Sequence, residues 1–196
     1  MLTSRVLLLV VLVFAAAFSR LVPHLHNATP IAAMTLFAAA YMPSRRWSLL
    51  LPLVAMFLSD IVLYATKDAA FVNQAISNMV VVYSTFAVIA LMGQWLRRRV
   101  TAGRVIGITL GGSAVFFLIT NFGAWLSLSQ PLSATEPATY ARSLSGLINC
   151  YIAGVPFFQG TFVGDVVYSA ALFGGFALLE QLVPQIKPQL VEATVN

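Results

Sequence analysis

Apolar residues form six long runs along the chain, and short polar segments separate them. Windows of about 19 residues predict membrane spans. The predicted spans are 6–22, 29–42, 47–65, 75–96, 105–126 and 161–183. The second is short, because a bilayer core of about 30 Å needs roughly 20 helical residues. The pattern predicts an all-α integral membrane protein, a six-helix transmembrane bundle that forms one domain over residues 1–196.

The longest stretch outside a predicted span is 127–160, before the last helix. Its first half is rich in Pro, Ser and Thr, whereas 144–158 is apolar. About fifteen residues that include Asn149, Gly154 and Pro156 rise too little to cross the membrane as a helix. We therefore expect an extracytoplasmic lid or a re-entrant segment here. A helix lying in the lipid headgroups and a seventh crossing are the alternatives.

Composition places the chain in a bilayer, since 60% of its residues are hydrophobic, 9% are charged and the mean hydropathy is +0.89. Lys and Arg are retained on the cytoplasmic side during insertion. In the six-span arrangement, eight of the 11 basic residues fall on one side: Arg5, Arg45, Arg46, Arg97, Arg98, Arg99, Arg104 and Lys187. The sequence thus predicts a multi-pass protein of the bacterial inner membrane with both termini in the cytoplasm.

The net charge of +5 and the run Arg97–Arg99 do not indicate a nucleic-acid partner, because such clusters are the usual cytoplasmic ends of membrane helices. The chain has one cysteine, Cys150, and two histidines, His24 and His26. The sequence contains no phosphate-binding loop, zinc-protease motif or nucleophile elbow. We expect no metal, no cofactor and no enzymatic activity, and an intramembrane enzyme is the least favoured class.

Polar residues gather where the predicted spans meet the outer side. An ionised side chain at mid-span costs roughly 2.5 to 3.5 kcal/mol, so such residues are candidates for function. The candidate substrate-binding residues are Arg20, His24, Asn27, Asp60, Asn78, Asn121, Trp125, Asn149, Tyr151 and Asp165. The alternative is that they only lock the bundle. In either case Arg20 needs a carboxylate partner, and Asp60 and Asp165 are the candidates.

Small residues form two stripes in the opposite half of the last two spans. On the fifth span, residues of the stripe are spaced four apart: Gly103, Gly107 and Gly111, with Gly112 adjacent. On the sixth, the same spacing recurs in two pairs: Ala170 with Gly174, and Ala171 with Gly175. Such stripes permit close helix approach. We expect them to pack within the chain, and a docking surface for another subunit is the alternative.

Several short motifs resemble an uncharacterised family of small bacterial multi-pass membrane proteins, and the likeness covers nearly the whole chain. The motifs are RLVP at 20–23, NATPIAA at 27–33, LSD at 58–60, NFGAW at 121–125, GLINCY at 146–151, PFF at 156–158 and GD at 164–165. That family in turn is similar, more distantly, to the substrate-binding S components of energy-coupling-factor (ECF) vitamin transporters.

The second resemblance implies six helices, both termini inside and an outward-facing site closed by extracytoplasmic loops. It also implies a vitamin-like small molecule as the substrate, with cobalamin as one candidate. The partners it implies are membrane lipid, an ECF-type coupling subunit and the ATPases of that subunit. S components commonly carry Ala-x-x-x-Ala on the first helix, whereas the nearest match here is Ala15 to Ser19. Some cobalamin-binding relatives ligate cobalt with a cysteine; for Cys150, packing is the favoured role.

These observations lead to one expected function and one alternative. We expect a binding and uptake component of a membrane transporter that captures a small solute from the outer side. The alternative is a structural or assembly subunit of a membrane complex with no substrate of its own.

Overall fold

The computed structural model describes residues 4–23, 27–130 and 137–187, and the described chain is all-α, with no strand. Counted with α6, η2 and α7 as one continuous helix, it has six main helices. The elements are α1 (Ser4–Ser19), α2 (Ile31–Tyr41), α3 (Arg45–Tyr64), α4 (Ala69–Gly93), η1 (Gln94–Arg98), α5 (Ala102–Leu128), α6 (Leu144–Ser169), η2 (Ala170–Gly174), α7 (Gly175–Leu182) and η3 (Pro184–Ile186).

Local chemistry sets where two of the long helices begin. The Asp68 carboxylate accepts a hydrogen bond from the Phe71 amide at 2.8 Å and caps the first turn of α4. The Ser143 hydroxyl accepts from the Gly146 amide at 3.2 Å and caps α6. Both caps satisfy amide groups that the first helical turn leaves without a partner.

Helix α2 forms the centre of the bundle. All its residues from Ile31 to Ala40 are buried, and it packs against α1, α3, α4, α5 and α6. A helix that is apolar on every side is stable only when other elements surround it. Its 11 residues span only about 17 Å, so α2 does not cross a full bilayer core.

Four helices of the described chain are long and apolar enough to span a membrane. They are Arg45–Tyr64, Ala69–Arg98, Ala102–Leu128 and Leu144–Leu182. Large apolar side chains stay exposed on their outer faces, for example Val80, Ile106 and Val167. An apolar surface of this kind is what a bilayer solvates. The predicted spans 6–22 and 29–42 correspond to the shorter helices α1 and α2.

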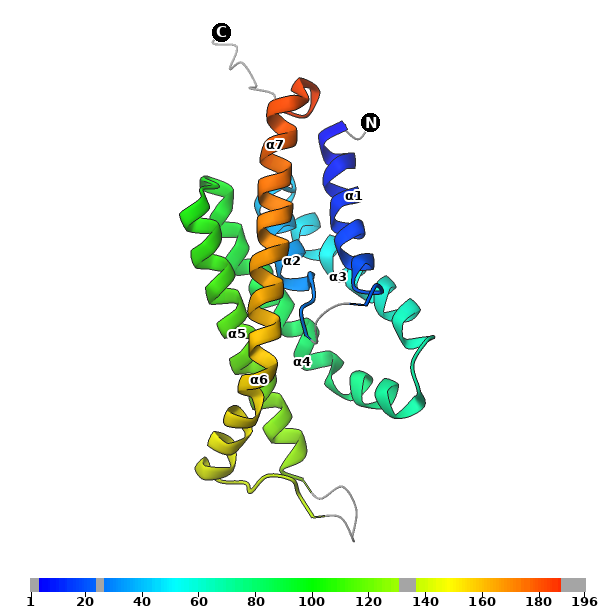
Figure 1. The fold of residues 1–196 in the computed structure, drawn as a ribbon, viewed down its shortest axis with the longest axis vertical. Helices are drawn as coiled ribbons and strands as arrows, with labels where there is room; N and C mark the ends of the chain where they lie inside the picture. Colours follow the sequence, from blue (N-terminus) through cyan, green and yellow to red (C-terminus); the bar gives the residue numbers. More distant parts are fainter. Residues whose placement is uncertain (1–3, 24–26, 131–136, 188–196) are drawn as a thin grey trace.

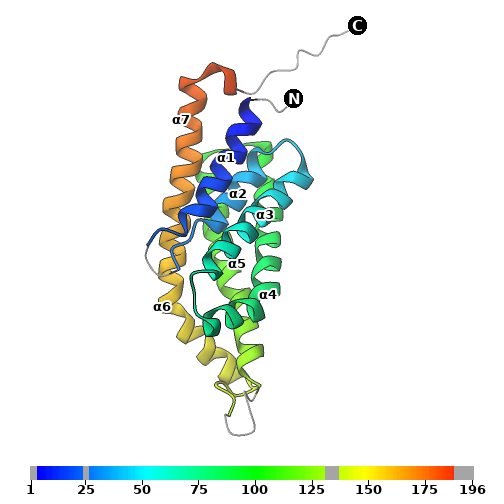
Figure 2. The ribbon, with the colours of Figure 1, turned by 90° about the vertical axis from the view of Figure 1, so that its right-hand side faces the viewer.

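Both described ends of the chain lie at the same end of the bundle, opposite the turn between α5 and α6 (Figures 1 and 2). The Arg5 guanidinium forms an ion pair with Glu180 and donates to the Ile186 carbonyl at 2.6 Å, which joins the start of α1 to the end of α7. Arg97 donates to the Met42 and Pro43 carbonyls at 2.7 Å, so η1 lies beside the α2–α3 turn at that end. Which side of a membrane this end faces stays a prediction from the charge pattern.

The expectation of a re-entrant segment over 144–158 is wrong. These residues are the first part of α6, which continues through η2 into α7 as a helix of 39 residues. Pro156 lies inside this helix. A proline removes one backbone hydrogen bond and can kink a helix, but it does not always end the helix. At about 58 Å the helix is much longer than a bilayer core, and its first part pairs with the end of α5 (Figure 1). The lid predicted over 127–160 is in part this hairpin, and 131–136 lies outside the described residues.

Candidate functional site

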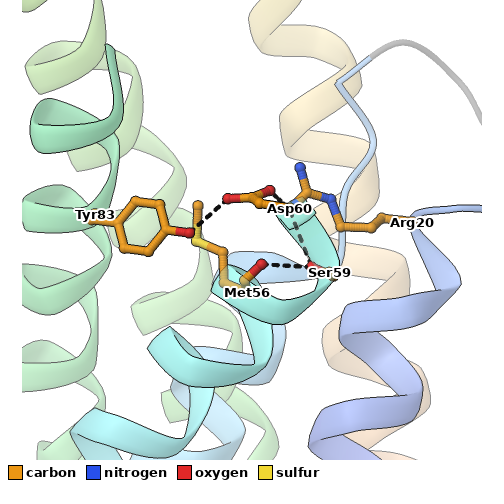
Figure 3. Close-up of polar contacts among 5 residues, drawn as sticks. All are labelled: Arg20, Met56, Ser59, Asp60 and Tyr83. Carbon is orange, nitrogen blue, oxygen red and sulfur yellow. Dashed lines mark hydrogen bonds and ion pairs between the residues drawn. The ribbon is translucent and has the colours of Figure 1, made fainter. Parts of the chain in front are cut away.

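A charged network joins the ends of α1 and α3 to the middle of α4 (Figure 3). The Arg20 guanidinium lies 2.5 Å from one carboxylate oxygen of Asp60, and the Tyr83 hydroxyl donates to the other at 2.6 Å. The Asp60 side chain is 3% exposed and that of Arg20 13%. The predicted ion pair of Arg20 is therefore confirmed, with Asp60 as its partner.

The second buried carboxylate, Asp165, has a different environment. It lies on α6 and is 2% exposed. Its Oδ2 accepts a hydrogen bond of 2.6 Å from the Ser113 hydroxyl of α5. Among the described residues, no Lys or Arg forms an ion pair with it. One turn further along the same two helices, the hydroxyls of Thr109 and Ser169 lie 3.1 Å apart.

Two neighbouring cavities connect these groups. One, of about 190 Å³, is lined by Arg20 and Asp165 together with Thr29, Met56, Phe86 and the first residues of α2. The other, of about 240 Å³, is lined by Asn121, Thr120, Gly154 and the rings of Phe117, Phe157 and Phe158. Asn27, Phe116 and Thr161 line both, so the two cavities adjoin. The walls are mainly apolar with a few polar groups, which is typical of small-molecule sites.

The connection between α1 and α2 forms one wall of both cavities. Asn27 adopts a left-handed backbone conformation with φ 61°, and its carbonyl accepts a hydrogen bond from the Thr29 amide at 2.9 Å. Asparagine tolerates this conformation better than most residues. The connection packs against Gly164 of α6, where a Cβ atom would lie 2.7 Å from the Ala28 Cα. Non-helical backbone thus lies against the middle of a helix that is long and apolar enough to span a membrane, where it lines a cavity.

The structure brings five of the ten predicted site residues together. Arg20 and Asp165 line one cavity, Asn121 lines the other and Asn27 lines both. Asp60 does not line a cavity but holds Arg20. His24 lies outside the described residues.

The other predicted residues of the described chain line neither cavity, although Trp125 and Tyr151 lie one turn from Asn121 and Gly154, which do. Trp125 donates its indole N–H to the Ala141 carbonyl at 3.1 Å, and Tyr151 donates to the Leu118 carbonyl at 2.8 Å; both join α5 to α6 or to the segment before it. Asn149 is exposed and Asn78 half-buried, and neither lines a cavity. Cys150 is buried and its thiol lies 3.5 Å from the Asn121 carbonyl, a packing position.

Sequence reasoning missed Ser113, Tyr83 and Phe116. A signal for Ser113 exists, because it lies eight residues before Asn121, two helical repeats of four on one face of α5. Tyr83 had no such signal, since a tyrosine within an apolar span is equally compatible with packing. Its role depends on how α4 is rotated toward Asp60.

The small-residue stripes do not pack within the chain at most positions, which corrects that expectation. A Cβ atom added at Gly103, Gly107 or Gly174 would meet nothing within 4 Å, whereas one at Gly111 would lie 3.5 Å from Met92. These helix faces stay open because no other helix of the described chain covers them.

The helices and cavities define a class: an all-α protein with four helices long and apolar enough to span a membrane, and with two small, mainly apolar cavities that carry a few polar groups. A family model described as a family of unknown function (DUF6580) matches residues 1–186, and the chain belongs to that family. The predicted membership of an uncharacterised family is thereby confirmed. The comparisons with curated proteins and with solved structures found no match.

Proposed function

We propose that this protein is the small-solute-binding component of an uptake transporter in a bacterial inner membrane. The observation that carries the proposal is the pair of adjoining cavities that share Asn27, Phe116 and Thr161. Each cavity alone is smaller than the roughly 300 to 1,000 Å³ of a typical ligand pocket. A compact solute that occupies both therefore fits better than a molecule as large as cobalamin.

The backbone around the cavities supports this proposal. Membrane transporters commonly place their sites where a spanning helix is interrupted, because the free ends of the helices then face the ligand. Here Ile31 and Ala32, in the first turn of α2, line the cavity that also holds Arg20 and Asp165. A helix that starts inside the bundle presents amide groups without helical partners to that cavity.

The resemblance to S components supports a role for partner subunits. In this proposal the solute enters from the end opposite the termini, and a coupling subunit with ATPases supplies the energy. The open faces at Gly103 and Gly107 would allow another helix to approach closely. We propose no catalytic role.

A structural subunit is the second candidate, and the Arg20–Asp60–Tyr83 network favours it. Three helical elements are joined there by buried polar contacts, which stabilise the bundle whether or not a solute binds. The two candidates differ in what they predict for residues that line the cavities without joining helices.

Mass spectrometry of the protein purified in mild detergent distinguishes them. We expect a small molecule to co-purify with the wild-type protein and to be lost, at least tenfold, in Asn121→Ala and Thr161→Val. Both side chains line the cavities, and neither takes part in an ion pair of the described chain. The matched control is Trp125→Phe, which lies near Asn121 on α5 but lines neither cavity.

The control should retain the molecule, and all variants should remain monodisperse. No co-purified molecule in any preparation, or equal loss in the control, would favour the structural role.

A further inference from the structure

Asp165 lines a cavity, and among the described residues no cation pairs with it as Arg20 pairs with the other buried carboxylate, Asp60. Asp60 has both oxygens satisfied, one by Arg20 and one by Tyr83. Asp165 is equally buried, yet Ser113 is the residue that donates to it in the described chain. An ionised carboxylate in that position is expensive unless something neutralises it.

The hydrogen bonds around Ser113 accommodate a neutral Asp165. The Ser113 hydroxyl has one hydrogen but two acceptors within reach, Asp165 Oδ2 at 2.6 Å and the Thr109 carbonyl at 3.1 Å. It can donate to only one of them at a time. When Asp165 carries a proton, it donates to Ser113 Oγ, and Ser113 donates to Thr109. When Asp165 is ionised, Ser113 turns and donates to the carboxylate.

We propose that Asp165 is a proton-binding site that exchanges its proton with the cavity, with Ser113 as the residue that positions both states. The proton adds to a carboxylate oxygen, the Ser113 hydroxyl rotates, and no other bond changes. The charge of the cavity wall thereby changes by one unit. The importance of this change for transport rests on the proposed function, whereas protonation itself does not require a solute.

Among the described residues, the charged and titratable groups around Asp165 interact with other partners. Arg20 at the end of α1 shares its cavity but is paired with Asp60 of α3, and Tyr83 of α4 donates to Asp60. Tyr168, on α6 itself, has its hydroxyl 3.4 Å from Ser19. From α5, the polar groups near Asp165 are the hydroxyls of Ser113 and Thr109, and α2 contributes apolar residues apart from Thr35 and Tyr41. His24 and His26 lie outside the described residues.

The shape of α6 also marks this region. The residues after Ser169, Ala170–Gly174, form a π-helical turn, and Pro156 lies nine residues before Asp165. Such π turns occur frequently at functional sites. The stretch that carries Asp165 is therefore bounded by two irregularities of the same helix.

Infrared difference spectroscopy of the full chain tests the proposal. The protein would be reconstituted without added solute in phosphatidylethanolamine–phosphatidylglycerol vesicles and titrated with protons alone. We expect the wild type to show the carbonyl band of a protonated carboxylic acid that disappears as the pH is raised. The band should be lost in Asp165→Asn and kept in Asp68→Asn, which removes the exposed carboxylate at the start of α4.

Ser113→Ala assigns the band to Asp165 even if Asp165→Asn does not fold. This variant keeps the Asp165 carboxyl group but removes its hydrogen-bond partner, so the carbonyl band should shift. A band that is unchanged in both variants belongs to another group and would overturn the proposal. The proposal would also be overturned if Asp165 stayed ionised throughout the titration. A carboxylate whose spectrum changes with added sodium ions but not with pH would be such a case. Because no solute is added, these results are independent of whether solute capture is upheld.

Discussion

Replacing Asp60 with Asn is expected to lower the free energy of unfolding by about 3 to 5 kcal/mol, which is the usual cost of removing one partner of a buried ion pair. The variant leaves the Arg20 guanidinium, whose side chain is 13% exposed, without its carboxylate. For a chain of this length, that loss corresponds to a fall of roughly 6 to 20 °C in the unfolding midpoint. Thermal unfolding in detergent, followed by circular dichroism, measures it.

Two further variants separate charge from packing. Tyr83→Phe keeps the ion pair and removes one hydrogen bond to Asp60, so its effect should be smaller, about 1.5 to 3 kcal/mol. The double variant Arg20→Met with Asp60→Leu removes both charges and should recover much of the stability that Asp60→Asn loses. The free energy of unfolding that Arg20→Met and Asp60→Leu each lose alone is the reference. If the double variant lost the sum of these two amounts, Arg20 and Asp60 would not be energetically coupled.

Replacing Gly164 with Val is expected to destabilise the protein and to close both cavities. The new Cβ atom would lie 2.7 Å from the Ala28 Cα and 2.8 Å from the Ala28 carbonyl carbon, which are backbone atoms that cannot rotate away. Overpacking typically costs about 1 to 3 kcal/mol, and this contact should reach the upper end of that range. Displacing Ala28 also displaces Asn27, which lines both cavities, so the co-purified solute should be lost as well.

Gly103→Val is the matched control, because it also replaces a glycine in an apolar helix. A Cβ atom at Gly103 meets nothing within 4 Å, so the free energy of unfolding should change by less than about 1 kcal/mol. Comparing the unfolding midpoints and the bound solute of the two variants tests the contact. Equal effects at the two positions would show that the close approach of Ala28 to α6 does not exist in the protein.

The sequence predicts the first five helices well, because each is one apolar run ended by polar residues. The apolar pattern predicts the last helix to start at 161, whereas it starts at Leu144. Two features that usually interrupt helices, Gly154 and Pro156, account for the error. Gly154 allows close contact between α6 and the Asn121 side chain, and the helix continues through Pro156 because its other backbone hydrogen bonds remain.

The sequence predicts which ends of the helices carry the candidate site, but not how far along each helix the cavities extend. The apolar pattern selects Arg20, Asn27, Asn121 and Asp165 because each lies at or beside the predicted outer end of an apolar run, and the structure brings them to two adjoining cavities. Depth alone also selects Trp125, which lies one turn beyond Asn121 on the same face of α5 and donates to the Ala141 carbonyl instead of lining a cavity. Where along a helix a cavity ends depends on how that helix packs against its neighbours, which a single apolar pattern does not determine.

Labelling of single cysteines tests most directly whether the cavities open to the side opposite the termini. In a Cys150→Ala background, Thr161→Cys places a thiol at one of the three residues that line both cavities, and Arg98→Cys places one at the basic end. A membrane-impermeant maleimide applied to the outer face of the membrane should label Thr161→Cys and leave Arg98→Cys unlabelled until the membrane is opened. Labelling of Arg98→Cys from the outer face, with Thr161→Cys reached only from the other side, would contradict the account.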